Sequence, residues 1–342
     1  MPNSGLVQTV TGPIAPEALG LVLMHEHLLC DLTSPALRAT GGPEVEITLD
    51  NAFEVTYRPG EFLGNHRLQD VAVATREARL FREAGGGTIV EVTTGGLAPD
   101  PQGLAEIARE SGVNVVLGAG FYTGDYIDEA TRRLTADEMA ETMIAQLTEG
   151  AWGTAVRCGL IGEIGCSWPL TPFERRSLEA AAAAQARTGA AITVHPGRDP
   201  QAPHEILDVL GRAGADISRV IIDHMDRTYF DDGEVVALAR RGCVVEFDFF
   251  GIETSNYWMG VADLPTDWMR LRAIRRLFEA GLGERVAISH DICTRSRLRT
   301  YGGHGYAHLP RNVVPLMRDR GFSTAEIETL LVDTPRRLLT LA

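Results

Sequence analysis

The feature that most constrains the fold is a regular alternation of short apolar runs with longer segments of helical spacing along most of the chain. The apolar runs are residues 21–27, 88–93, 113–118, 158–165, 191–195, 220–224, 243–248 and 285–291. Such a run is typical of a buried strand, and strand plus helix recur after about thirty residues, the size of a βα unit. The alternation therefore predicts an α/β protein with a parallel sheet, and eight units predict a closed (β/α)8 TIM barrel. A nine-strand or open doubly wound sheet is the alternative.

The segments between the apolar runs carry the start and stop signals of helices. Thr135 and Thr171 stand at N-cap positions, Pro172 follows in a first turn, and three glycines come before residue 88. The predicted helices are residues 70–84, 101–111, 135–148, 171–188, 203–213, 233–241, 267–280, 312–320 and 323–341.

Two stretches lie outside this alternation. Residues 6–14 alternate and then turn, which predicts a short N-terminal β-hairpin that closes one end of the barrel. Residues 31–66, after the first strand, are interrupted by prolines and glycines and are long enough to form a lid or rim over the mouth. We expect residues 1–342 to form a single domain, since barrels of this class are long.

Composition argues against several classes of partner. The net charge of −14 and the pI near 5.1 disfavour nucleic acid and membrane surfaces, because phosphate-rich surfaces need clustered cations. No apolar stretch is long enough to span a membrane, and the first residues lack the pattern of a signal peptide. The five scattered cysteines form no C-x-x-C pair, which predicts reduced thiols. We therefore expect a cytoplasmic protein.

Polar residues that end the apolar runs are the candidates for chemistry, because active sites of such barrels lie at the C-terminal ends of the strands. These residues are His25, His27, Glu163, His195, His224 and Asp291. His25 and His27 stand at i and i+2 of one strand, so both imidazoles are expected to face the same side. Four imidazoles and two carboxylates at one end of a barrel indicate a metal site.

The number of candidate ligands bears on the number of ions. One tetrahedral zinc ion takes three or four protein ligands, whereas six ligands with a central carboxylate suit two divalent ions. The sequence contains no lysine, which excludes Schiff-base catalysis and a carboxylated lysine as a bridge, and leaves Glu163 to bridge the ions. We predict two divalent ions per chain, with Zn²⁺ favoured and Mn²⁺ or Co²⁺ as alternatives.

Longer stretches around these residues resemble the phosphotriesterase family, and within it the branch of phosphotriesterase-related proteins in the amidohydrolase superfamily. The resemblance covers nearly the whole chain and rests on residues 7–10, 158–170 (CGLIGEIGCSWPL), 194–198 (VHPGR), 214–218 (GADIS), 224–228 (HMDRT) and 301–308 (YGGHGYAH). It implies that one, more buried ion is bound by His25, His27 and Asp291, that a more exposed ion is bound by His195 and His224, and that Glu163 joins both. Many relatives have a carboxylated lysine as the bridge, and this chain resembles the glutamate-bridged branch.

A hydroxide shared by two cations at neutral pH would attack a carbonyl carbon or a phosphorus atom. Asp291 is placed to take the proton and pass it to the leaving group, as general acid–base catalysis requires. Tyr122, which ends the third strand, resembles the tyrosine that faces the substrate in lactonase relatives and would donate to the developing oxyanion. A rim aromatic is the alternative for Tyr122.

Arginines follow two of the ligand-bearing strands. Arg198 comes after the fifth strand, and Arg295 and Arg297 come after the eighth. In so acidic a chain, guanidinium groups near the mouth predict an anionic group on the substrate, a carboxylate or a sulfonate. Surface ion pairs are the alternative for most of them. His304, in the glycine-rich loop after the eighth strand, is expected to position that loop or to line the substrate pocket.

The resemblance implies hydrolysis of a small anionic N-acyl amide, of the N-acetyltaurine or N-acyl amino acid type. A lactone or an organophosphate ester is the second hypothesis, since the same hydroxide serves all three. A non-catalytic binder of a small molecule is the third, although a pure binder does not need all six ligand positions. Relatives of this fold are often homodimers, whereas the sequence leaves the oligomeric state open.

Overall fold

The structure is a computed structural model that describes residues 3–254, 257 and 263–342. Within these residues one eight-stranded sheet runs in the order β12–β11–β10–β9–β8–β7–β6–β3, and neighbouring strands are parallel. The strands are β3 (Leu21–Glu26), β6 (Gly86–Glu91), β7 (Asn114–Ala119), β8 (Leu160–Gly165), β9 (Ile192–His195), β10 (Val220–Ile222), β11 (Val244–Phe247) and β12 (Val286–Ile288). Each overlaps one predicted apolar run, so the predicted set of strands is confirmed.

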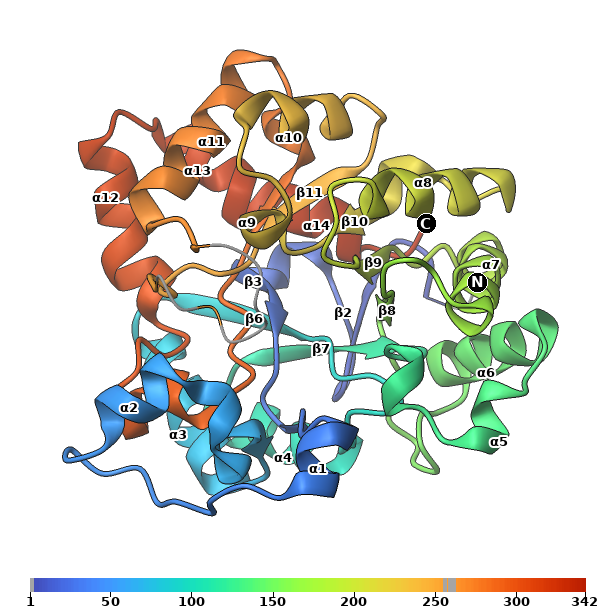
Figure 1. Cartoon of the computed structure of the whole chain (residues 1–342). Helices are drawn as coiled ribbons and strands as arrows, with labels where there is room; N and C mark the ends of the chain where they lie inside the picture. Colours follow the sequence, from blue (N-terminus) through green and yellow to red (C-terminus); the bar gives the residue numbers. More distant parts are fainter. Residues whose placement is uncertain (1–2, 255–256, 258–262) are drawn as a thin grey trace.

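The two end strands of this order, β3 and β12, meet at a seam. The His25 amide donates to Ser289 Oγ over 3.0 Å, and the Asp291 amide donates to the His25 carbonyl over 3.1 Å. Glu26, between the two ligand histidines, accepts from Ser289 Oγ at 2.7 Å and from the His290 amide at 3.0 Å. These bonds join the end strands into a nearly closed barrel (Figure 1), which confirms the TIM barrel over the open doubly wound sheet.

The wall of the barrel separates two apolar clusters. Along β3, Val22 and Met24 pack inside the barrel, whereas Leu23 packs against the surrounding helices. The pairing of β3 with β6 then shifts in register between Leu23 and Glu26. If side chains alternated strictly along β3, His25 would point in the same direction as Leu23, toward the helices. The register shift is therefore what turns His25 to the mouth of the barrel.

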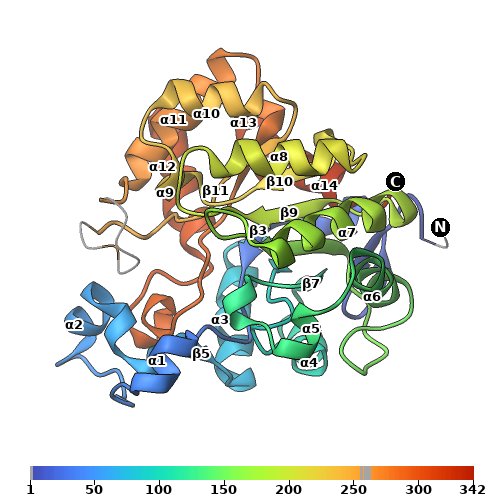
Figure 2. The same cartoon turned by 45° about the vertical axis from the view of Figure 1, so that its right-hand side comes forward.

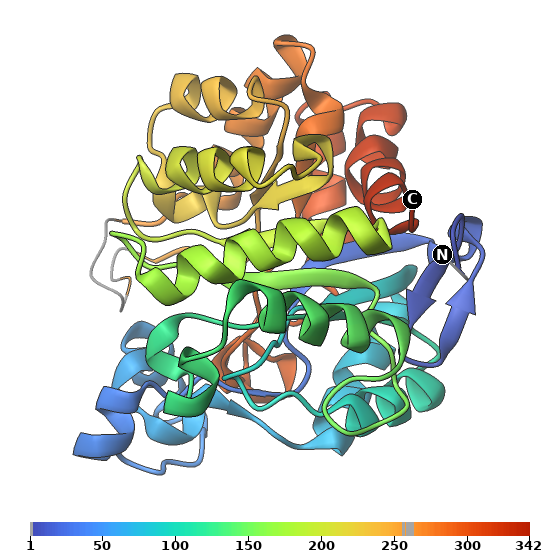
Figure 3. The ribbon, with the colours of Figure 1, turned by 90° about the vertical axis from the view of Figure 1, so that its right-hand side faces the viewer.

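Helices surround the sheet on its outer side (Figures 1 and 3). They are α3 (Val71–Glu83), α4 (Pro101–Ser111), α5 (Glu129–Arg132), α6 (Ala136–Thr148), α7 (Pro172–Thr188), α8 (Ala202–Arg212), α9 (Met225–Thr228), α10 (Asp232–Ala239), α11 (Asp267–Glu279), α12 (Val314–Asp319), α13 (Thr324–Glu328) and α14 (Thr334–Leu339). Thr135 and Thr171 cap α6 and α7 through capping boxes, as their sequences predict. None of the helices in the described part of the chain has the length and apolar character of a membrane span.

The long segment after β3 is more ordered than a loop. It contains α1 (Pro35–Thr40) and α2 (Ala52–Tyr57), and its base is closed where β4 (Cys30–Asp31) pairs antiparallel with β5 (Arg67–Leu68). In Figure 2, α1 and α2 lie together at one side of the barrel. Part of the segment lines a cavity beside the mouth, described below, which agrees with the rim that the sequence predicts.

The opposite end of the barrel carries the predicted hairpin, formed by β1 (Val7–Thr9) and β2 (Gly12–Ile14). The Val10 amide donates to the Val115 carbonyl, near the start of β7, so the hairpin covers the N-terminal ends of the strands. The Gly5 amide donates to the Leu341 carbonyl over 2.9 Å, and both chain ends therefore lie side by side here (Figure 3).

Candidate metal centre

The six predicted ligands come together in the mouth of the barrel as two sets of atoms that share one glutamate. In the first set, His27 Nε2 lies 3.5 Å from Glu163 Oε1 and 3.3 Å from Asp291 Oδ1. His25 Nε2 lies 3.8 Å from Asp291 Oδ1. His25 is fully buried and its Nε2 has no hydrogen-bond partner. An unpartnered imidazole nitrogen that faces two carboxylates suits a cation between them.

The second set lies on the other side of Glu163. His195 Nδ1 is 3.1 Å from Glu163 Oε2 and 2.9 Å from His224 Nε2. Two imidazole nitrogens at this distance must share either a proton or a cation, because two lone pairs repel each other. Both rings are almost completely buried. Glu163 thus turns Oε1 toward His27 and Oε2 toward His195 and His224, and His25 Nε2 lies 3.8 Å from the same Oε2.

Burial keeps the imidazoles neutral. It lowers the pKa of His25 to about 3 although the Asp291 charge acts in the opposite direction. Burial, and then the charge of Arg227, also hold the pKa values of His195 and His224 well below the usual range. Neutral imidazoles keep a lone pair for a metal ion at pH 7. The donor set therefore fits a divalent metal without prior loss of a proton from these rings.

The two carboxyl groups shift in opposite directions. Burial, together with the negative charge of Asp291, raises the pKa of Glu163. Burial also acts to raise the pKa of Asp291, but the hydrogen bond to His27 and the positive charge near it outweigh burial and leave it below its usual value. Without a cation, a proton shared by these two carboxyl groups is therefore bound by Glu163, and Asp291 is ionised.

Hydrogen bonds from a surrounding layer orient the ligand rings. His27 Nδ1 lies 2.8 Å from Thr93 Oγ1, and His224 Nδ1 lies 2.9 Å from Asp248 Oδ1. Asp248 Oδ2 also accepts from the His224 amide at 2.9 Å. Such partners fix the tautomer that leaves the other nitrogen free for a metal. Asp248 ends the seventh predicted strand, and the rule that located the six ligands applies to it as well.

The backbone at two ligands is in the left-handed region. His224 has φ of 59° and Asp291 has φ of 50°. Residues other than glycine enter this region at a cost of about 1–3 kcal/mol each, and such strain gathers at functional sites. The strain sets the direction of both side chains where their strands end.

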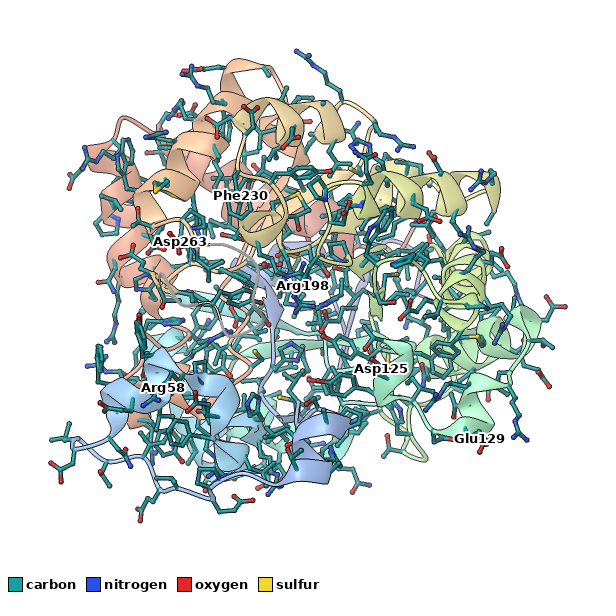
Figure 4. The ribbon with its side chains drawn as sticks, in the orientation of Figure 1. Arg58, Asp125, Glu129, Arg198, Phe230 and Asp263 are labelled. Carbon is teal, nitrogen blue, oxygen red and sulfur yellow. The ribbon has the colours of Figure 1, made fainter. Side chains whose placement is uncertain are left out.

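Three other predicted residues line the same cavity as the ligands: Tyr122, Arg198 and Arg297. Tyr122 is buried, and its Oη lies 3.3 Å from His195 Nδ1. Arg297 Nη1 donates to the Asp291 carbonyl and lies 3.7 Å from Asp291 Oδ2. Figure 4 labels Arg198 near the centre of the ring of helices.

Two predicted substrate-binding residues lie elsewhere. Arg295 donates through Nε to the Arg67 carbonyl over 2.8 Å and lines a depression beside Leu68. The structure therefore does not bring it to the cavity lined by the candidate metal ligands, called the ligand cavity below. Its position next to Arg297 in a short helical turn points the two side chains in different directions. His304 lines a neighbouring cavity, and its Nε2 is buried without a partner.

Among the charged residues that line the cavity in the described part of the chain, one was not a sequence candidate. Arg227, in α9, is 1% exposed and lies against His195, with 3.2 Å between Arg227 Nη2 and His195 Nε2. A signal for it exists in the sequence, since His195 and His224 are each followed three residues later by an arginine, Arg198 and Arg227.

The space between the ligands and these residues is a cavity of about 50 Å³. A second cavity of about 350 Å³ adjoins it, and Tyr257 and Arg297 line both. Thr56 and Pro59, from the segment that holds α2, contribute to the second cavity. The mouth of the barrel thus offers a small polar site for ions with a larger space beside it.

A TIM barrel with clustered histidines and carboxylates at the C-terminal ends of its strands defines a metal-dependent hydrolase of the amidohydrolase kind. The sequence matches the phosphotriesterase family over residues 5–339. The chain belongs to the phosphotriesterase family, which uses divalent metal ions.

Relatives match the chain along its whole length. An N-acetyltaurine hydrolase of Salmo salar is 43% identical and covers 98% of both chains. A phosphotriesterase-related protein of Nematostella vectensis is 40% identical over 99% of both chains. These relatives agree with the family resemblance read from the motifs.

Solved structures match as well. A resiniferatoxin-binding protein from Rhodobacter sphaeroides has a TM-score of 0.93 at 37% identity, covering 99% of this chain and 96% of its own. A phosphotriesterase homology protein from Escherichia coli, complexed with phosphate in its active site, has a TM-score of 0.79 at 28% identity, covering 94% of this chain and 99% of its own.

Proposed function

We propose that this chain is a binuclear metal hydrolase that cleaves small anionic N-acyl amides of the N-acetyltaurine or N-acyl amino acid type. The observation that carries the proposal is the place of Glu163 among the buried nitrogen donors of both sets, with Oε1 toward His27 and Oε2 toward His195. Six donors around a central carboxylate suit two divalent ions better than one. Zn²⁺ is the proposed ion, because four of the six ligands are imidazoles.

The two sets of atoms suggest which residues hold each ion. The more buried ion would take His25, His27 and Asp291, and the other ion would take His195 and His224, with Glu163 shared. Ions in these positions supply activated water and polarise the scissile carbonyl. The lowered pKa of Asp291 keeps its carboxylate ionised, so it can accept the proton of the attacking water and deliver it to the leaving amine.

The buried hydroxyl of Tyr122 supports a second role in the same reaction. It lies beside His195, on the side of the more exposed ion, where the carbonyl oxygen of a substrate would be polarised. There it would donate to that oxygen as negative charge develops. Burial and the charge of Glu163 hold the pKa of Tyr122 well above its usual value, so the hydroxyl keeps the proton that it donates.

The anionic character of the substrate is supported by Arg198, Arg227 and Arg297, which all line the ligand cavity. Guanidinium groups bind planar and tetrahedral oxyanions with two parallel hydrogen bonds. The amide class is supported by the full-length relatives named N-acetyltaurine hydrolase.

The test combines metal analysis with a substrate panel. Purified protein is expected to hold about two divalent ions per chain and to hydrolyse N-acetyltaurine or an N-acetyl amino acid faster than an acyl lactone or a paraoxon-like ester. A single ion would contradict the binuclear centre. Turnover of lactones or phosphate esters alone would contradict the substrate class, and full metal content without turnover of any panel member would favour a small-molecule binder.

A further inference from the structure

Among the residues that the structure describes, the two bulkiest fully buried side chains are arginines, and their surroundings differ. Arg270 donates to the carboxylates of Asp226 and Asp267. Arg227 Nη2 donates to the Pro196 carbonyl over 2.9 Å, whereas its Nε and Nη1 have no hydrogen-bond partner. A buried guanidinium without a counter-charge is strongly unfavourable. Arg227 therefore has no ion-pair partner among the described residues, whereas Arg270 pairs with two carboxylates.

Arg198 is only partly buried and faces the same cavity as Arg227. Both side chains line the ligand cavity, together with Tyr122 and Glu163. Arg198 Nε is buried and has no partner. The charge of Arg198 adds to burial in lowering the pKa of Arg227, as expected for two guanidinium groups close together. Two neighbouring cations that face one cavity repel each other unless an anion lies between them.

The third arginine of the cavity is already engaged. Arg297 Nη1 donates to the Asp291 carbonyl and, over 3.2 Å, to Cys293 Sγ, and it lies 3.7 Å from the Asp291 carboxylate. These contacts engage Arg297 Nη1 with the segment after β12. The unsatisfied donors are thus concentrated on the side of the cavity that β9 and β10 supply.

We propose that Arg198 and Arg227 form a clamp for the oxyanion of the substrate, a sulfonate or a carboxylate tethered to the scissile amide. The identity of the tethered amide rests on the proposed function, but the clamp itself does not. Both side chains line the cavity, and Arg227 Nε and Nη1 and Arg198 Nε have no hydrogen-bond partner, so the pair has N–H donors free for a planar or a tetrahedral oxyanion. Each arginine lies three residues after a candidate metal ligand, so the clamp adjoins the candidate metal site.

Binding to metal-free protein tests the clamp without turnover. Calorimetry compares three ligands of similar length after treatment with a chelator: N-acetyltaurine, N-acetyl-β-alanine and the neutral N-acetylethanolamine. We expect the anionic ligands to bind about ten- to a hundredfold more tightly than the neutral one, as hydrogen bonds to charged groups imply. The first two ligands separate the sulfonate from the carboxylate. Equal binding of all three would overturn the proposal.

The variants Arg227→Gln and Arg198→Gln each remove one cation of the clamp. Either change is expected to abolish most of the preference for anionic over neutral ligands, and Arg227→Lys is expected to restore part of it. The control is Arg133→Gln, which removes the same charge from the exposed ion pair with Glu129 on α5, at the edge of the molecule in Figure 4. The proposal is overturned if both glutamine variants keep the full preference.

The loaded enzyme gives a second readout. In the variants the ratio of KM for the neutral amide to KM for the anionic amide is expected to fall toward one, and metal content measured beside it shows whether His195 still holds its ion. If the protein binds anionic ligands more tightly than neutral ones but hydrolyses no amide, the clamp is supported and the proposed reaction is contradicted. If the protein hydrolyses neutral and anionic amides with the same KM, the clamp is contradicted and the proposed reaction is supported.

Discussion

Asp291 concentrates several properties in one side chain. Its backbone is left-handed, its amide donates to the His25 carbonyl, and its carboxylate lies 3.3 Å from His27 Nε2. The carboxylate is therefore placed by the seam between β3 and β12 and by strain in its own backbone. Neither contact is local in the sequence, yet the position of Asp291 at the end of an apolar run was enough to select it.

Replacement of Asp291 by asparagine keeps the size of the side chain and removes its charge and its basicity. We expect kcat for the preferred amide to fall by about 10²- to 10⁴-fold, the usual contribution of a general acid–base group. The measurement is kcat with metal in excess, with metal content determined on the same sample. Asp128→Asn, at an exposed helix cap, is the control and should leave kcat unchanged. Wild-type turnover by the Asp291→Asn protein would rule out the assigned role.

The arginines show where reasoning from single residues succeeds and fails. Arg198, Arg295 and Arg297 were selected because they follow ligand-bearing strands, and the structure brings Arg198 and Arg297, but not Arg295, to the ligand cavity. The direction of a side chain in a loop depends on contacts that no periodicity encodes. Arg227 lies in a motif already used for the family resemblance and repeats the spacing of Arg198, and its burial with unpartnered N–H groups marks it in the structure.

At the scale of elements, local signals predict more than non-local ones. The helix α4 begins and ends at the predicted residues, and α6 and α7 begin after their predicted caps, because capping and turn residues act within a few positions. The short helices α1 and α2 were not predicted, because the prolines and glycines of this segment are typical of a loop and helices of one or two turns show too little periodicity. The register shift in β3 depends on the neighbouring strand β6 and leaves no mark in the sequence of β3 itself.

Glu26 belongs to the seam between β3 and β12, and it supports a test at this scale. Its carboxylate is fully buried and accepts from Ser289 Oγ, the amides of His290 and Ile292, and lies 2.6 Å from His290 Nδ1. Glu26→Gln keeps the shape but replaces charged acceptors with a neutral amide. We expect the free energy of unfolding to fall by about 1–3 kcal/mol, together with a loss of activity, because the seam positions Asp291.

Urea unfolding of the metal-loaded protein measures this change. Glu110→Gln, an exposed glutamate near Arg79, is the matched control and should change the free energy of unfolding by less than about 0.5 kcal/mol. An unchanged midpoint for Glu26→Gln would mean that the seam is held by the backbone bonds of β3 and β12 alone.

For the whole molecule, the site and the fold are parts of one structure. Candidate ligands come from the first, middle and last thirds of the chain, and segments near its two ends are tied together beside the hairpin, where the Leu341 amide donates to the Leu6 carbonyl over 3.0 Å. A chain closed in this way is expected to unfold as one unit, which is the single domain of 1–342 that the sequence predicts. A site that draws on β3, β8, β9, β10 and the segment after β12 should then report on the stability of the entire barrel.

Removal of metal should therefore lower the melting temperature of the whole protein in one transition. Without a cation, Glu163 and Asp291 face each other as buried carboxyl groups, and the pKa of Glu163 is raised for that reason as well as by burial. An ion that binds only the folded state adds RT ln(1 + [L]/Kd), about 2.7 kcal/mol at a hundredfold excess over Kd. Calorimetry with a chelator, and again after Zn²⁺ is restored, should show a reversible shift of several degrees.

The same calorimetric measurement tests whether the site holds one ion or two. His195→Asn removes a ligand of the second set only, so it should abolish the part of the metal-dependent stabilisation that comes from the more exposed ion and keep the rest. His204→Asn, at a histidine of α8 outside the barrel mouth, should keep the full shift. Since His195 is assigned to the second set and His25 to the first, loss of the entire shift in the His195→Asn protein would mean that all six ligands serve a single ion. Loss of only a part, with one ion retained per chain, would place two separate ions in the mouth of one cooperatively folded barrel.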